Sequence, residues 1–188
     1  MIKGNKISFR PVQISDAEIL CKWYNNGELM KHVGFNNGLN TSADKLSANI
    51  AKEVEDKDKN RSRRRFIVIE NSTDMPIGEV SFGNLDLKNK SCDIGIKICV
   101  LDKQGMGYGY DALNTFLNYL FKTYNLHRIE LDTLLENVRA QHLYEKVGFK
   151  RIGLKRDCWL DPQNCYRSAI LMDILREEFI VKRIIRKN

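Results

Sequence analysis

A run of alternating glycines has the residue types and spacing of a phosphate-binding turn. The run, Gln104 to Gly109, lies between an extended apolar stretch, residues 92–100, and an amphipathic segment that starts near residue 110. Glycines let the backbone adopt positive φ and approach a ligand closely, so that successive N–H groups can converge on one anion. A following helix adds its free N-terminal N–H groups and the positive end of its dipole. The run therefore predicts a pyrophosphate site.

The glycine spacing argues against two common nucleotide motifs. A dinucleotide fingerprint needs two residues between its second and third glycines, and here Tyr108 alone separates Gly107 from Gly109. That fingerprint also opens a series of βαβ units, whereas several strands with little helix precede this run. A P-loop is excluded because the chain contains no GxxxxGK[ST].

The glycine run and a second segment further along the chain resemble the two signatures of one known family. Gln104-x-x-Gly107-x-Gly109 matches the Gln/Arg-x-x-Gly-x-Gly/Ala signature of GNAT N-acetyltransferases, and residues 137–149 resemble the second signature of that family. One predicted helix and one predicted strand separate the two signatures, as in the family. The resemblance extends from Lys6 to Leu175. The opening at residues 7–11 is similar to the ribosomal-protein-alanine acetyltransferase branch, which also contains polyamine and antibiotic acetylators.

The resemblance implies a cosubstrate, acetyl-CoA, and the spacing of the cysteines and histidines predicts no metal site. Its pantetheine arm would lie between splayed strands 92–100 and 128–134 as an added pseudo-strand, with the pyrophosphate on the glycine run. The residues expected to bind it are Ile98, Cys99, Val100, Gln104, Gly105, Met106, Gly107, Tyr108, Gly109 and Asn137. Asn137 is equally expected to cap the helix that follows it.

The implied reaction is acetyl transfer to a primary amine, either a protein N-terminus or a small molecule, by direct attack in a ternary complex. Tyr144 would lie near the sulfur and protonate the departing thiolate, although a core aromatic has the same helical spacing. Glu79 and Asp93, on adjacent predicted strands, are the candidate bases, although such acids are more often strand-pairing residues. A backbone N–H near Cys99 or Val100 would stabilise the oxyanion.

Periodicity predicts the elements that must position these residues. Helices are expected over residues 15–25, from residue 41 or 42, over residues 110–124 and over residues 137–147. Strands are expected over residues 7–10, 66–70, 77–85, 92–100, 127–134, 151–156 and 166–175. The fold expected is a single α/β domain of GNAT type, residues 1–176, with a mixed, mostly antiparallel sheet of six to seven strands flanked by helices. Residues 177–188 would form a C-terminal extension.

Composition sets limits on location and partners. No apolar run of the 188 residues approaches the ~20 needed to span a bilayer, and no secretory signal begins the chain, so we expect a cytoplasmic protein without a membrane partner. The five cysteines show no CxxC spacing and the three histidines no metal-ligand spacing. A net charge of +7 favours anionic partners in general.

Several alternatives remain open from the sequence alone. A non-catalytic acyl-CoA-binding or ribosome-associated module would use the same pocket without turnover. The charged segment 55–65 is expected to be a solvated loop, while its arginines, Arg61 and residues 63–65, leave an RNA-binding alternative that we do not favour. The tail 176–188 is expected to pack on the body or on a second subunit, so that a homodimer is one expected assembly.

Overall fold

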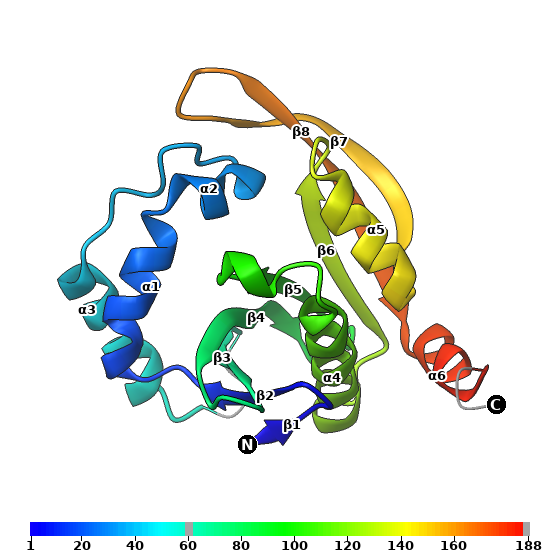
Figure 1. The fold of residues 1–188 in the computed structure, drawn as a ribbon. Coiled ribbons are helices and arrows are strands. Elements are labelled where there is room, and N and C mark those ends of the chain that lie inside the picture. Colours follow the sequence, from blue (N-terminus) through cyan, green and yellow to red (C-terminus); the bar gives the residue numbers. More distant parts are fainter. Residues whose placement is uncertain (59–61, 186–188) are drawn as a thin grey trace.

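The computed structural model describes residues 1–58 and 62–185. In these residues one eight-stranded sheet runs in the order β1-β2-β3-β4-β5-β6-β8-β7 (Figure 1). The strands are β1 (Ile2–Lys3), β2 (Ile7–Pro11), β3 (Arg64–Glu70), β4 (Pro76–Asp86), β5 (Ser91–Ile98), β6 (Arg128–Leu134), β7 (Lys150–Leu160) and β8 (Tyr166–Leu175). Only the β5–β6 pairing is parallel in this sheet. The expected sheet type is confirmed, and the count of six to seven was too low because β1, with two residues, is too short to show alternation.

Helices flank the sheet on both faces. They are α1 (Ala17–Tyr24), α2 (Gly27–Met30), α3 (Ala43–Glu55), α4 (Tyr108–Thr123), α5 (Val138–Val147) and α6 (Arg176–Ile185), with single 3₁₀ turns at Ile14–Asp16, Lys31–Val33 and Leu101–Lys103. The predicted long helix is α4, whose apolar positions at helical spacing are all buried. It begins two residues earlier than expected, so the end of the glycine run forms its first turn.

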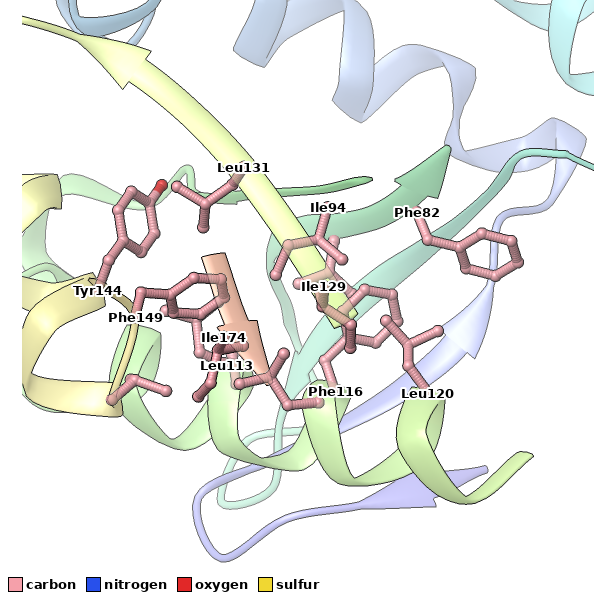
Figure 2. Packing of buried hydrophobic residues seen from close by; sticks show 14 of the residues in the cluster. Phe82, Ile94, Leu113, Phe116, Leu120, Ile129, Leu131, Tyr144, Phe149 and Ile174 are labelled. Atoms are coloured by element: carbon pink, nitrogen blue, oxygen red, sulfur yellow. The ribbon is translucent and has the colours of Figure 1, made fainter. Parts of the chain in front are cut away.

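Two hydrophobic clusters hold the helices to opposite faces of the sheet. In β3, Phe66 and Val68 pack on the α4 side, whereas Ile67 and Ile69 pack on the side of α1 and α3. Because successive side chains of a strand point to opposite faces, a strand buried on both sides reads as a continuous apolar run. Figure 2 shows the first cluster, with Phe116 of α4 against the strands and Phe149 close to Tyr144.

The sheet opens between its two central strands. β5 pairs with β6 only from Ser91 opposite Arg128 to Asp93 opposite Glu130. Beyond these pairs β5 continues along β4 as far as Ile98, while β6 continues along β8 as far as Leu134. The two strands therefore diverge, which confirms the predicted splay between strands 92–100 and 128–134.

The charged segment differs from the expected solvated loop. α3 continues to Glu55, and β3 already begins at Arg64. Arg65 is buried, with its Nε 2.8 Å from Oε2 of Glu53. A long cationic side chain can bury its aliphatic stem while its head is paired, which a pattern of charges does not reveal. Arg61 lies outside the described residues.

The last helix packs on the body of the molecule. Phe179 of α6 is buried, with its ring 5.5 Å from that of Phe121 in α4. Residues 186–188, and the side chains of Ile184 and Ile185, lie outside the described residues. The boundary expected after residue 176 stays a prediction. No helix in the described ranges has the length and apolar character needed to cross a membrane.

Candidate active site

A cavity of about 670 Å³ lies where β5 and β6 diverge. Its lining comes from both sides of the sheet: Gly109, Leu143 and Tyr144 belong to α4 and α5, and Trp23 and Tyr24 belong to α1. A volume of this size suits a small-molecule ligand or cofactor arm. The cavity therefore connects the glycine run to the wall formed by α1, β3 and β4.

The glycine run forms an N–H-rich turn leading into α4. Gly105 and Gly107 have φ of 78° and 87°, the left-handed region that favours glycine. In the part of the chain that the structure describes, no protein acceptor takes the backbone N–H groups of residues 105–109. Since α4 starts at Tyr108, its positive end adds to these donors. This arrangement can bind an anion, as the sequence predicts.

The turn is anchored from outside the cavity by a buried carboxylate. Glu70, 2% exposed, accepts hydrogen bonds from Lys103 Nζ at 2.8 Å, from Thr73 Oγ1 at 2.6 Å and from the Tyr108 hydroxyl. These donors, Lys103 above all, lower the pKa of Glu70 to about 2. On the other side, Lys6 Nζ donates to the carbonyl oxygen of Met106 at 3.0 Å.

Two residues of the glycine run that were expected to bind the cofactor do not line the cavity. Tyr108 directs its hydroxyl to Glu70, and Met106 is exposed with its carbonyl held by Lys6. Both residues thus hold the turn in place from behind.

Gln104 spans the opening between β5 and α5. Its Nε2 donates to the carbonyl oxygen of Ile98 at 2.8 Å, and its Oε1 accepts from Arg139 at 2.8 Å. Arg139 also lines the cavity, as do Lys103 and Lys146. Sequence reasoning gave these three cations no role, although Arg139 lies inside the second signature and follows its first residue by two positions.

Asn137 caps α5 and also reaches across to a neighbouring turn. Its Oδ1 accepts from the backbone N–H of Ala140 at 3.2 Å, and its Nδ2 donates to the carbonyl oxygen of His32 at 3.3 Å. It lines the cavity as well. The capping role expected for Asn137 is present, and its side chain links the splayed half of the sheet to the segment after α2.

The backbone N–H groups that were expected to bind pantetheine and the oxyanion at Cys99 and Val100 are already bonded within the sheet. The N–H groups of Cys99 and Val100 both donate to the carbonyl oxygen of Ile77, at 2.7 and 3.3 Å. Because alternate residues direct their backbone groups to opposite neighbours, Ile96 and Ile98 direct theirs toward the gap. Ile98 and Cys99 line the cavity, while Val100 packs against the core instead. Ile96 lines the cavity and was missed by sequence reasoning.

Tyr144 has a core ring and a hydroxyl at the cavity. Its ring lies 5.9 Å from that of Phe149, and Figure 2 shows the oxygen at the cluster edge near Leu131. Burial first, then the charge of Asp132, raises the pKa of Tyr144 to about 12. Within the described residues its hydroxyl has no hydrogen-bond partner. Tyr144 thus has the packed ring expected of a core aromatic and a hydroxyl that a ligand could reach, and its role as proton donor stays a prediction.

Glu79 lines the cavity on the side of α1 and β4, within a polar cluster. The Tyr24 hydroxyl donates to its Oε2 at 2.7 Å, and Lys97 Nζ lies 2.8 Å from its Oε1. Burial, followed by the charge of Glu79, raises the pKa of Tyr24. Lys97 also sits over the Tyr24 ring, 4.5 Å from its centroid. Tyr24 and Lys97 carried no motif that could have found them.

The second candidate base, Asp93, is not brought to the cavity. It lies opposite Gly83, four positions along β4 from Glu79, which corresponds to about 13 Å of strand. Its carboxylate accepts from Asn84 Nδ2 at 2.6 Å. Adjacent strands were predicted correctly, but their register separates the two acids.

Comparisons with known proteins agree with this geometry. Residues 6–150 match the family model described as acetyltransferase (GNAT) domain. A spermidine N(1)-acetyltransferase of Vibrio cholerae is 30% identical over 94% of this chain and 97% of its own length. An uncharacterized N-acetyltransferase, p20, of Bacillus licheniformis is 26% identical over 81% of this chain and 83% of its own. The crystal structure of spermidine N-acetyltransferase from Vibrio cholerae in complex with CoA and spermine has a TM-score of 0.82 and 26% identity, covering 93% of this chain and 98% of that one.

Proposed function

The chain belongs to the GNAT family of acetyl-CoA-dependent N-acetyltransferases, and we propose that the cavity between β5 and β6 is where it transfers acetyl to a primary amine. One observation carries this assignment. A single cavity joins the N–H-rich glycine turn, the free edge of β5 and the Tyr144 hydroxyl, which are the parts that hold a phosphate, an extended amide chain and a leaving thiolate.

Acetyl-CoA would bind along the glycine turn and the edge of β5. The N–H groups of residues 105–109 and the α4 N-terminus take the pyrophosphate, with Lys103, Arg139 and Lys146 supplying positive charge nearby. The pantetheine amides pair with Ile96 and Ile98 as an added strand, since β6 has left this edge unpaired.

The transfer needs one bond made and one broken. The amine nitrogen attacks the thioester carbonyl carbon, whose oxygen accepts a hydrogen bond from a backbone N–H of β5 that faces the gap, and the carbon–sulfur bond then breaks. Tyr144 donates its proton to the departing thiolate, a step that suits a phenol whose pKa of about 12 keeps it protonated at neutral pH. Glu79 accepts the amine proton, directly or through water.

Direct attack is favoured over an acetyl-cysteine intermediate. Cys99 lines the cavity, but burial, followed by the charge of Glu79, raises its pKa to about 12. The thiol is therefore neutral at physiological pH, and the neutral form is a poor nucleophile. The acceptor would then meet acetyl-CoA in a ternary complex.

Thiol release from acetyl-CoA tests the proposal. With a panel of primary amines that includes spermidine, the acceptor in the name of the Vibrio cholerae relative, we expect acceptor-dependent release and an acetylated product by mass spectrometry. Calorimetry with CoA would run in parallel. Tight CoA binding without turnover on any acceptor would instead favour the non-catalytic binding module. The cytoplasmic location and the homodimer expected from the sequence stay predictions.

A further inference from the structure

Basic side chains outnumber acidic ones around the cavity. The lining contains two carboxylates, Glu79 and Asp132, and six Lys or Arg side chains. The six are Arg63, Arg65, Lys97, Lys103, Arg139 and Lys146. Arg139 and Lys146 would face coenzyme phosphates, whereas Lys103 lines the cavity beside the glycine turn but pairs with Glu70 behind it. The remaining three cations belong to β3, β5 and the segment that leads into β3. They lie on the side of the cavity formed with α1 and β4, which we call the acceptor wall.

Both lining carboxylates already face cations. Glu79 binds Lys97 and the Tyr24 hydroxyl. Asp132 lies near Tyr144, whose pKa its charge raises, and has Lys155 Nζ at 3.9 Å. One of them can hold the reacting amine. Among the described lining residues, no further carboxylate is left for a second ammonium group.

One arginine of the acceptor wall is left to bind an anion. Arg65 is ion-paired with Glu53 through its Nε and also interacts with the Tyr24 hydroxyl, and Lys97 is paired with Glu79. Arg63 is exposed, lines the cavity and has no acidic partner in the part of the chain that the structure describes. Free guanidinium N–H groups in a fork bind carboxylate or phosphate oxygens in bidentate fashion.

The connection that closes this side of the cavity adds no negative charge. Residues 31–42 contain a lysine and a histidine but no aspartate or glutamate. His32 and Val33 line the cavity, and the neighbouring Phe35 ring lies 5.3 Å from that of Trp159 on β7. An acceptor in this half of the cavity would thus meet basic, aromatic and apolar groups.

We infer that the acceptor is a primary amine that also carries a carboxylate or phosphate group, which Arg63 binds with Arg65 and Lys97 beside it. This inference rests on the proposed function. A polyamine would bring a second ammonium against Arg63, and like charges at close range oppose binding. The spermidine specificity in the names of the relatives is therefore not expected here.

Matched acceptor pairs test the inference by thiol release from acetyl-CoA. The carboxylate pair is δ-aminovalerate against cadaverine, which share a five-carbon chain, and the phosphate pair is ethanolamine phosphate against ethanolamine. Amidated Ala-Glu and Ala-Lys dipeptides test a peptide amine, and spermidine is the polyamine reference. We expect kcat/KM at least about tenfold higher for the anionic member of one or more pairs, as for one charge-assisted hydrogen bond.

Reversing one charge should remove this preference. Arg63→Glu is expected to lower kcat/KM for the preferred anionic acceptor about tenfold or more and leave the KM for acetyl-CoA unchanged. Lys88→Glu, the same charge change at an exposed turn outside the cavity, is the control and should behave as the parent. Transfer with spermidine or cadaverine as best acceptor overturns the anionic-acceptor inference and leaves the proposed function standing. No thiol release with any amine, despite CoA binding, overturns both.

Discussion

Tyr144 combines a packed ring with a hydroxyl that only a bound ligand would engage. Tyr144→Phe keeps the ring against Phe149, so we expect the melting temperature to stay unchanged. The kcat should fall about 100-fold, since a positioned general acid contributes roughly that much, while the KM for acetyl-CoA changes less than about twofold. Tyr166→Phe, at a tyrosine that is 67% exposed on β8, is the control. An unchanged kcat in Tyr144→Phe would remove this tyrosine from the mechanism.

Glu70 makes the stability of the fold depend on pH in the acid range. Its pKa is about 2 in the folded protein, below the ordinary value of 4.5. Its contribution is complete above about pH 4.5 and is lost as the pH falls toward 2, because the unfolded chain then takes up a proton that the folded chain does not. Glu70→Gln should therefore flatten the pH dependence of the unfolding free energy between those values.

Urea unfolding at a series of pH values would measure this slope. Glu18→Gln, at an exposed carboxylate on α1, serves as the matched control and should keep the parent slope. Because Glu70 also holds Lys103 and Tyr108 behind the glycine turn, Glu70→Gln should raise the KM for acetyl-CoA more than it lowers kcat. A parent-like slope together with a parent-like KM would contradict both roles.

Among the elements, the turn from β5 into α4 depends on backbone conformation more than on side chains. Gly105 has a φ of 78°, and a Cβ there would meet nothing within 4 Å. Gly105→Ala therefore adds no clash, only the cost of a left-handed backbone, about 1 kcal/mol. Reorienting the turn should raise the KM for acetyl-CoA severalfold. Gly83→Ala is the control, because a Cβ there also has open space but the residue has no positive φ, and its CoA binding by calorimetry should match the parent. If the KM for acetyl-CoA is the same in the two variants, the turn is not the anion site.

Across the whole molecule, one aromatic contact joins the two halves over the cavity. Figure 1 shows the β7–β8 hairpin reaching toward α2. Trp159 of β7 packs on Phe35, and it lies so close to Gly34 that a Cβ on that glycine would be 1.9 Å from the Trp159 ring. Trp159→Ala should raise the KM for the amine acceptor about tenfold, by loss of an aromatic wall, and leave the KM for acetyl-CoA unchanged. Leu160→Ala, at an exposed neighbour outside the cavity, is the control in the same steady-state assay. A rise in both KM values would mean that the contact supports the fold as a whole.

The cofactor half of this protein can be recognised from local sequence. The glycine turn, α4 and α5 are encoded locally: positive φ requires glycine, helical faces repeat within a few residues, and Asn137 and Gly148 delimit α5. Both signatures lie on these elements. They could therefore be recognised before any tertiary contact was known.

The acceptor half depends on contacts between residues far apart in the sequence. The strand register places Glu79 at the cavity and Asp93 away from it. In β5 the backbone groups that face the gap belong to Ile96 and Ile98, because the N–H groups of Cys99 and Val100 bond to Ile77. Tyr24 binds Glu79 across 55 positions of sequence. A shift of one residue in a strand reverses which neighbour its backbone faces, and no local pattern fixes that register. The acceptor wall is built from such long-range contacts, so its charge became visible only in the folded chain.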